Sequence, residues 1–463
     1  MKIYLILFFL LFCFSAISAQ PQAKEVKSDA VDKFVAERML DMKIPGLALA
    51  VLQDGKVVKM SVYGQANLET GTPVKSESVF IIASLGKQFV AAAILLLQRD
   101  GKLALDDKAS KYLDGFPEPW KEITFRQLLT HTSGIVRDPA DYHPYKQQPV
   151  TEVIEAMYSV PLNSKPGEKW LYSNVGYYIL AEAITKISGK PWDKFIAERI
   201  FVPAGLTATR TTSPSDIIPN RVSGYHQAPE GRTNAENWLA VRPSGSFLST
   251  IQDLAKWDAF LDKGNLLTET ERRLMWTRGA LTDNTPVNYG LGWNVDSYLG
   301  RTRINHDGQY PGFRADYERF PDDKLSVIVL ANLDNWGLAR LAVKIAGFYK
   351  ETLAAPPFSI SVKTPQNTFA AKSPVAIEIQ ARNDDKKAAP RTILEMEIWD
   401  DAGKSVYKQN KANVDYAAGE TKTYNFSWTP EKAGKYTVNV GTFGPRWTPD
   451  YTWKVNLATI TVN

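Results

Sequence analysis

The chain changes its hydrophobic pattern once, at Ala354-Ala355-Pro356-Pro357, and this change constrains the fold more than any other feature. Before the prolines, helical and strand periods are mixed, whereas after them the helical period vanishes. The tail contains short alternating segments separated by Gly, Asp, Asn or Pro, at residues 375–382, 393–399, 405–409, 421–428, 435–441 and 452–462. About a hundred residues with this spacing predict an antiparallel β-sandwich of the immunoglobulin-like kind, an accessory domain at residues 358–463.

Residues 20–355 predict an α+β domain. A helix over residues 28–42 is followed by two strands joined at Asp54-Gly55, which is a strong hairpin signal. A long apolar helix is expected from Ile81 to near Gly101. Strand patterns return at 290–295, 313–320 and 325–331, and a last helix runs from about 337 to 353. We expect an antiparallel sheet built from both ends of this region and flanked by helices, with a helical region inserted between its halves.

The first residues have the form of a signal peptide. One Lys precedes an apolar run to Phe14, and small residues follow up to Ala19. We expect residues 1–19 to be removed, so that the protein is exported to the periplasm or the cell exterior without a membrane span. Cys13, the only cysteine, lies in this segment, which excludes a Cys nucleophile and thiolate metal sites. The net charge of +5, without a basic stripe, argues against nucleic acid as a partner.

The pattern Ser84-Leu85-Gly86-Lys87 indicates nucleophilic chemistry. If a helix begins here, the hydroxyl and the amine lie three residues apart on one face and can meet. The helix dipole and the apolar run behind it both lower the pKa of Lys87, which makes it a credible base for Ser84. The same pattern recurs at Ser405-Val406-Tyr407-Lys408 in the β-rich tail, where no helix or partner is evident, and we interpret that copy as chance.

Two further segments accompany the first copy. Tyr172-Ser173-Asn174 precedes a helical run, and a phenol near a cationic Lys can relay a proton, although a helix cap would also explain these residues. His306-Asp307-Gly308 and Gln309 stand near the end of the predicted sheet, where His306 alone could equally be a loop histidine.

Taken together, these motifs resemble the penicillin-recognising serine hydrolases, specifically the class C-like branch of β-lactamases, esterases and D-amino-acid-directed peptidases. The resemblance covers roughly residues 30–350. Other segments that carry it are 80–84 with 101–107, 123–134, 249–250 with 253–257, and 289–293.

The resemblance implies a role for each residue. Ser84 would be acylated, and Lys87 and Tyr172 would share the proton transfers, with the division between them open. Asn174 would orient Lys87 and the acyl side of the substrate, while the backbone N–H groups of Ser84 and Gln309 would form the oxyanion hole. His306 and Gly308 would complete the substrate-binding strand. The three remaining histidines receive no catalytic role: His131 is interpreted as structural, and His143 and His226 carry no signal.

One departure from the family pattern bears on the substrate. Class C β-lactamases have Lys-Thr-Gly where this chain has His306-Asp307-Gly308, and a His of pKa ~6.5 offers a substrate carboxylate only part of a positive charge. This favours a carboxylesterase or D-amino-acid peptidase acting on a small molecule or peptide. A true β-lactamase and a sensor that binds without turnover remain alternatives. No metal or cofactor is expected, because H-E-x-x-H and dense His/Asp clusters are missing from the sequence.

The tail leaves a second question open. Gly441-Thr442-Phe443 with Trp447, Tyr451 and Trp453 faintly resembles the C-terminal modules of secreted glycosidases. Contact with a glycan or the cell wall through the C-terminal domain is therefore one hypothesis. The alternative is that these aromatic residues belong to the core of the sandwich.

Overall fold

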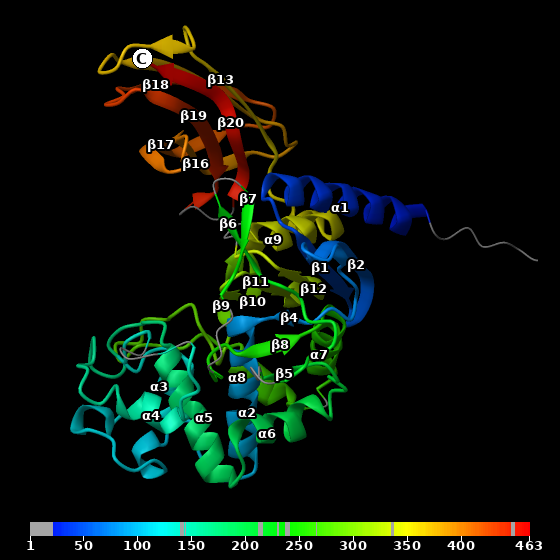
Figure 1. Cartoon of the computed structure of the whole chain (residues 1–463), viewed down its shortest axis with the longest axis vertical. Coiled ribbons are helices and arrows are strands. Elements are labelled where there is room, and N and C mark those ends of the chain that lie inside the picture. Colours follow the sequence, from blue (N-terminus) through cyan, green and yellow to red (C-terminus); the bar gives the residue numbers. More distant parts are fainter. Residues whose placement is uncertain are drawn as a thin grey trace, which may run out of the picture.

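The computed structural model describes residues 22–463 except 139–142, 144, 212–215, 229–230, 237–240, 265, 335–337 and 446–449. The predicted signal peptide lies outside these residues. Figure 1 shows an α/β part and, above it along the long axis, an all-β part. The predicted fold class, an antiparallel sheet with helices and an added all-β region, is confirmed.

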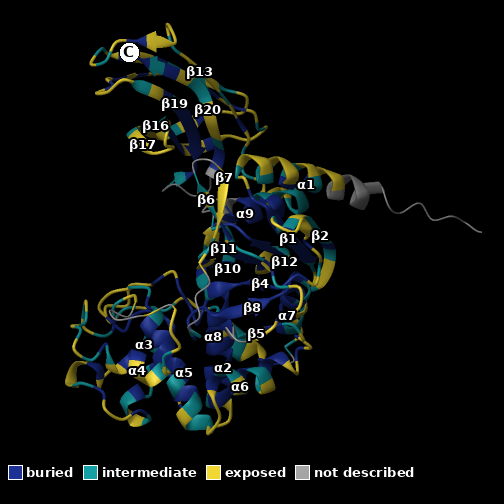
Figure 2. Ribbon diagram, viewed as in Figure 1, coloured by how far each residue is buried: buried dark blue, intermediate teal, exposed yellow. Residues whose placement is uncertain are grey.

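A seven-stranded antiparallel sheet forms the centre of the α/β part, in the order β3-β2-β1-β12-β11-β10-β9. Its strands are β1 (Gly46–Gln53), β2 (Lys56–Asn67), β3 (Thr72–Pro73), β9 (Asn294–Tyr298), β10 (Arg301–Tyr310), β11 (Phe313–Phe320) and β12 (Leu325–Ala331). The two ends of the region meet where β1 pairs with β12 in antiparallel register, Leu47 opposite Ala331. Every residue of β11 and β12 is buried, because helices cover both faces of the sheet (Figure 2).

One face of the sheet is covered by α1 (Gln22–Asp41) and α9 (Leu338–Tyr349), which share a hydrophobic core with it. The larger core lies on the other face. Along the described part of the chain, seven helices lie between the strands β1–β3 and the strands β9–β12 of this sheet. They are α2 (Lys87–Arg99), α3 (Phe125–Leu129), α4 (Val150–Glu155), α5 (Asn174–Ser188), α6 (Trp192–Ile196), α7 (Ile251–Lys263) and α8 (Glu269–Met275). Shorter helical turns are η1 (Ala83–Gly86), η2 (Ala109–Lys111), η3 (Glu118–Trp120), η4 (Ala197–Phe201), η5 (Pro321–Asp323) and η6 (Glu351–Leu353).

Two small sheets complete this part of the chain. The first has the order β4-β8-β5 and the second is a hairpin. Their strands are β4 (Phe80–Ile81), β5 (Arg210–Thr211), β6 (Tyr225–Ala228), β7 (Gly231–Asn234) and β8 (Phe247–Ser249).

The structure corrects two predicted boundaries. The helix expected from Ile81 begins only at Lys87, because Phe80 and Ile81 pair with β8 and the 3-10 turn η1 follows. Gly86 permits this tight arrangement, since an added Cβ would lie 1.9 Å from the ring of Phe247. Likewise, the strand expected at 290–295 begins only at Asn294.

The C-terminal strands form two facing sheets with a hydrophobic core of their own. The three-stranded sheet consists of β13 (Phe358–Lys363), β15 (Val375–Asn383) and β18 (Thr421–Trp428). The five-stranded sheet consists of β14 (Thr368–Phe369), β20 (Asp450–Val462), β19 (Gly434–Phe443), β16 (Ala389–Asp400) and β17 (Ser405–Tyr416). The sequence had not singled out β13 or β14. The domain limits 20–355 and 358–463, and the immunoglobulin-like character of the sandwich, stay predictions.

No helix among the described residues combines the length and the apolar character that crossing a membrane requires.

Candidate active site

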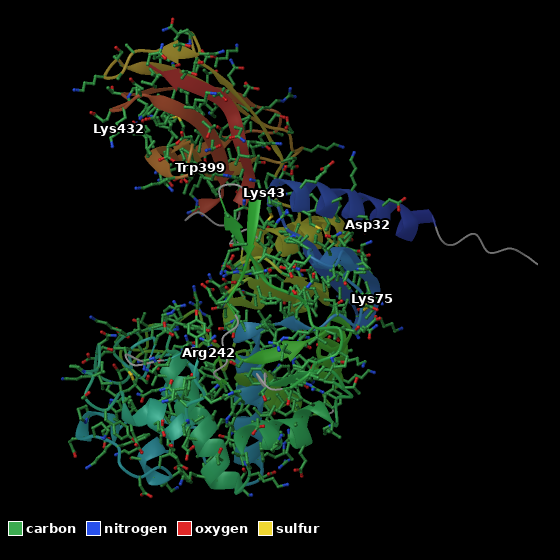
Figure 3. All side chains as sticks on the ribbon, viewed as in Figure 1. Asp32, Lys43, Lys75, Arg242, Trp399 and Lys432 are labelled. Carbon is green, nitrogen blue, oxygen red and sulfur yellow. The ribbon has the colours of Figure 1, made fainter. Side chains whose placement is uncertain are left out.

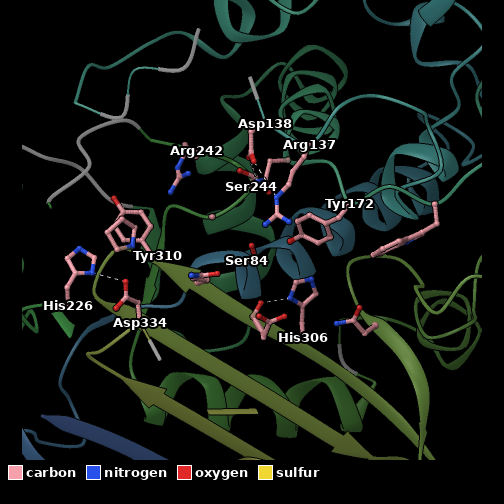
Figure 4. A pocket seen from close by; sticks show the side chains of 17 residues that line it. Ser84, Arg137, Asp138, Tyr172, His226, Arg242, Ser244, His306, Tyr310 and Asp334 are labelled. Carbon is pink, nitrogen blue, oxygen red and sulfur yellow. Dashed lines mark hydrogen bonds and ion pairs between the residues drawn. The ribbon is translucent and has the colours of Figure 1, made fainter. Parts of the chain in front are cut away.

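Ser84 lies on the turn η1, directly before the buried helix α2. The preceding residue, Ala83, has φ +49°. This left-handed conformation is energetically unfavourable for a residue that carries a side chain. Such strain is typical of functional sites, where the surrounding packing holds a reactive group in place. Ser84 is half-buried and lines a cavity of about 520 Å³. Figure 4 shows it between Tyr172 and His306 on one side and Arg242 and Tyr310 on the other.

Lys87, the first residue of α2, is completely buried beneath Ser84. Its Nζ lies 3.1 Å from Ser84 Oγ, 2.9 Å from Asn174 Oδ1 and 2.6 Å from the carbonyl oxygen of Ser244. The last two atoms can only accept hydrogen bonds. A neutral amine has two N–H groups for these acceptors and one lone pair left for the hydroxyl proton of Ser84. An ammonium would instead donate to all three oxygen atoms, so these contacts fit either charge state of Lys87.

The electrostatic surroundings favour the uncharged amine. Burial, followed by the positive charge of Arg242, holds the pKa of Lys87 well below its ordinary value of 10.5. Asp138 and Asp307 act in the opposite direction but do not restore it. A lysine in this environment can accept a proton from a neighbouring hydroxyl.

Asn174 is held in one orientation by its neighbours. It is the first residue of α5, whose N-cap Ser173 accepts a hydrogen bond from the N–H of Gly176. Asn174 Nδ2 donates to Asp138 Oδ1 at 2.5 Å, so its Oδ1 faces Lys87. Asp138 thus fixes which end of the Asn174 amide the lysine meets, a role that the sequence had not indicated.

Tyr172 borders the same cavity, with its ring centroid 4.9 Å from Lys87 Nζ. Burial raises the pKa of Tyr172 above its ordinary value of 10, and a hydrogen bond with Ser84 opposes this shift only in part. The phenol therefore keeps its proton at neutral pH. Lys87 and Tyr172, whose pKa values are shifted in opposite directions, present a proton acceptor and a proton donor to one hydroxyl.

His306 is buried on β10 and both of its ring nitrogens are engaged. Nδ1 donates to the carbonyl oxygen of Asp307 at 2.6 Å, so Nε2 carries the lone pair and accepts from the hydroxyl of Tyr289 at 2.8 Å. Burial lowers the pKa of His306 to about 4. The partial positive charge expected from the sequence is therefore corrected: this histidine is neutral at pH 7 and at pH 6.

Gly308 and Gln309 lie further along the same strand. Because β9 pairs with β10 only up to Asn305, the pocket edge of β10 beyond this point has no strand partner in the described part of the chain. Gly308 packs against the segment that carries Ser84, since an added Cβ would lie 2.2 Å from the carbonyl oxygen of Ile82. This close approach brings Gln309 to the cavity wall beside Ser84.

The structure thus gathers the predicted residues into one site. Five of them line the cavity, while Lys87 lies buried beneath it and Gly308 packs behind it. Sequence reasoning missed the other lining residues, namely Arg137, Asp138, Trp170, His226, Arg242, Ser244, Gly245, Asn294, Asp307, Tyr310, Pro311 and Asp334. His226, which had carried no signal, bonds Asp334 at 2.7 Å in this lining. Within the residues that the structure describes, no cluster of His, Cys, Asp or Glu could hold a metal ion.

The chain is similar in sequence to known proteins. The chain matches the family described as Beta-lactamase over residues 31–346. It is 28% identical over 309 residues to penicillin-binding protein 4* of Bacillus subtilis, covering 62% of this chain and 68% of that protein. It is 27% identical over 328 residues to a D-aminopeptidase of Brucella anthropi, covering 68% of this chain but only 61% of that protein.

A solved structure extends the likeness in fold. The octameric penicillin-binding protein homologue of Pyrococcus abyssi superposes with a TM-score of 0.63 at 20% identity, covering 90% of this chain and 98% of that one. Fold and site together define the class of protein, a serine hydrolase related to the β-lactamases. The chain belongs to the beta-lactamase family, whose match spans residues 31–346.

Proposed function

We propose that this protein hydrolyses an ester or amide through an acyl-enzyme formed on Ser84. The observation that carries the proposal is the contact of 3.1 Å between Lys87 Nζ and Ser84 Oγ, in surroundings that lower the pKa of the amine well below its ordinary value. Ser84 Oγ attacks the substrate carbonyl carbon while its proton passes to Lys87. Water later hydrolyses the ester bond to Ser84, which releases the acid and regenerates the hydroxyl.

The opposite pKa shifts support a division of labour between the two proton-handling residues. Lys87, whose pKa is lowered, acts as the base toward Ser84. Tyr172, whose pKa is raised, donates its phenolic proton to the leaving nitrogen or oxygen. The proton held by Lys87 then passes back to the phenolate, so the pair ends each acylation step in its starting state.

Backbone groups would stabilise the negative charge that develops on the carbonyl oxygen. The candidates are the N–H groups of Ser84 and Gln309, which the packing of Gly308 against Ile82 brings to one wall of the cavity. An oxyanion donor of this kind typically contributes about 3–4 kcal/mol to the lowering of the barrier. Asn174 would orient Lys87 and the acyl side of the substrate.

The neutral His306 supports an ester or a D-amino-acid amide over a β-lactam. A β-lactam is recognised in part through its carboxylate, and His306 has neither a free N–H nor a charge to offer it. The similarity to a D-aminopeptidase favours an amide of a D-amino acid. β-Lactam hydrolysis and binding without turnover are the competing functions.

Activity assays of matched serine variants test the proposal. Purified protein should hydrolyse p-nitrophenyl esters or D-amino-acid amides, and Ser84→Ala should abolish this activity. Ser405→Ala, a change at an exposed serine of β17, should leave it unaltered. Hydrolysis that survives in Ser84→Ala would overturn the nucleophile assignment, and acylation without release would identify a sensor.

We further propose export by the leader of residues 1–19 and a glycan-binding role for the sandwich. Of the three aromatic residues indicated by the sequence, Tyr451 is buried in the core and Trp447 lies outside the described residues. Trp453 on β20 is half-buried with its ring 6.4 Å from that of Trp399 on β16, so the pair offers a platform. Figure 3 labels Trp399 in the sandwich. Loss of binding to insoluble peptidoglycan in Trp399→Ala, with unchanged ester hydrolysis, would support this role; equal binding by the variant would contradict it.

A further inference from the structure

His131 occupies a backbone conformation that is uncommon for residues other than glycine. It follows the C-cap of α3 with φ +60° and is completely buried. Glycine or asparagine adopts this left-handed region at lower cost. Residues in such conformations cluster at functional sites, where the surrounding packing holds them in place.

Two hydrogen bonds connect His131 to the residues on either side of Tyr172. The N–H of Leu171 donates to the carbonyl oxygen of His131 at 2.8 Å. The N–H of Ser173 donates to His131 Nδ1 at 3.0 Å. The backbone before and after Tyr172 is therefore fixed to a single residue, once through its main chain and once through its ring.

The imidazole also contacts the phenol itself. The ring centroids of His131 and Tyr172 are 4.2 Å apart, and Tyr289 lies 4.5 Å away on the same imidazole. Because Nδ1 accepts the hydrogen bond from Ser173, the ring must be uncharged with its proton on Nε2. Burial is the largest cause that keeps the pKa of His131 well below its ordinary value of 6.5, and the positive charge of Arg137 acts in the same direction.

We propose that His131 is a positioning residue for Tyr172, holding the phenol at the distance from Ser84 and Lys87 that proton transfer requires. The inference rests on the proposed function of Tyr172 and extends it to a residue that the sequence had indicated as structural only. His131 is not itself one of the residues that line the cavity. Its effect is transmitted through the main chain of residues 171–173, and displacing a proton donor by about 1 Å can cost 10²-fold in rate.

Three substitutions separate the features of His131. Asparagine keeps an acceptor near the position of Nδ1 and tolerates the left-handed backbone, phenylalanine keeps a ring without an acceptor, and alanine keeps neither. We expect kcat for ester hydrolysis to fall about 10- to 10²-fold in His131→Ala and His131→Phe, with KM changed less than about twofold. His131→Asn should recover most of kcat. The exposed His143 provides a matched control, and His143→Ala should behave as wild type.

A double-mutant cycle with Tyr172→Phe distinguishes positioning from a general loss of structure. If His131 acts through Tyr172, His131→Ala should lower kcat in the wild-type background but have little further effect in Tyr172→Phe. Equal losses of kcat in both backgrounds, or equal losses in the Asn and Phe variants, would overturn the inference. Where His131→Ala fails to fold, the difference in kcat between His131→Asn and His131→Phe tests the same role. Full activity of Ser84→Ala or Tyr172→Phe would instead refute the proposed function on which the inference rests.

Discussion

The chain contains the pattern Ser-x-x-Lys twice, and the two copies lie in different secondary structure. Ser84 and Lys87 stand where a 3-10 turn enters a buried helix, and their polar atoms are 3.1 Å apart. Ser405 and Lys408 stand on the exposed strand β17, where residues three apart are separated by about 10 Å along the backbone.

The surroundings of the two lysines differ as much as their geometry. Lys87 is buried and its pKa is lowered, whereas the amine of Lys408 lies 2.7 Å from Glu395 and 3.0 Å from Glu397. Although its partial burial acts in the opposite direction, these two carboxylates raise the pKa of Lys408. The four-residue pattern therefore indicates chemistry only where a helix start aligns the pair and the core removes water from the amine.

Replacing the two lysines should give the largest difference between the copies. Lys87→Ala should reduce turnover of esters by ~10²–10⁴, the usual size of general base catalysis, whereas Lys408→Ala should leave it unchanged. Only uncharged Lys87 accepts the proton of Ser84, so activity should rise with pH through the pKa of Lys87, well below 10.5. Steady-state pH profiles check this. An acid limb that persists unaltered in Lys87→Ala would assign the titration to another group.

Tyr172→Phe should cost a similar ~10²–10⁴ in turnover, and its effect should not multiply with that of Lys87→Ala. The reason is that both residues belong to one proton-transfer network around Ser84, and we propose no such network around Ser405. Turnover measured for the two single variants and the double variant tests the coupling. Simple multiplication of the two losses would mean that the residues act independently.

Substituting His306 sharpens the account of specificity near Ser84. Nitrocefin turnover by the wild type should be at least ~10²-fold weaker than p-nitrophenyl ester turnover, equivalent to about 2.7 kcal/mol of barrier. Because the pKa of His306 is about 4, lowering the pH to 6 should not charge it or narrow this gap. His306→Lys should raise the nitrocefin-to-ester ratio about tenfold at neutral pH, or about 1.4 kcal/mol. Efficient nitrocefin turnover by the wild type would restore the β-lactamase function, and His143→Lys serves as the control.

Removing the C-terminal sandwich, which carries the second Ser-x-x-Lys copy, should have the smallest effect on ester hydrolysis. The sandwich has its own hydrophobic core, and the cavity lining ends at Asp334. A protein of residues 20–355 should therefore fold and hydrolyse small esters with kcat/KM within about twofold of the full chain, equal to about 0.4 kcal/mol. An insoluble or inactive fragment would show that residues 358–463 are part of the catalytic fold.

The sequence predicted those parts of the fold and site that depend on local pattern. The limits of β12 were correct because it is a short apolar run between turn residues, and those of β11 because apolar and charged residues alternate from Phe313 to Glu318. Ser84, Lys87, Tyr172 and His306 were found because each lies within a compact motif. Ile81 was placed in a helix because an apolar run of this kind has no periodicity that separates a strand from a helix; pairing with β8 decided it.

The remaining features depend on contacts between distant segments. Arg242, Ser244 and Asp334 reach the cavity from loops whose local sequence gives no functional signal. The hydrogen bond from the N–H of Ser173 to His131, whose backbone is left-handed, joins residues 42 positions apart. The neutral state of His306 follows from its burial, which is not visible in the motif that contains it.

The most direct test of the nucleophile assignment is to map the residue that a fluorophosphonate probe modifies in the unaltered protein. Labelled protein would be digested, and the peptide carrying the added mass would be sequenced by tandem mass spectrometry. We predict one adduct, on Ser84, with the peptide of Ser405 unmodified. An adduct on Ser405, or on any serine other than Ser84, would contradict the assignment.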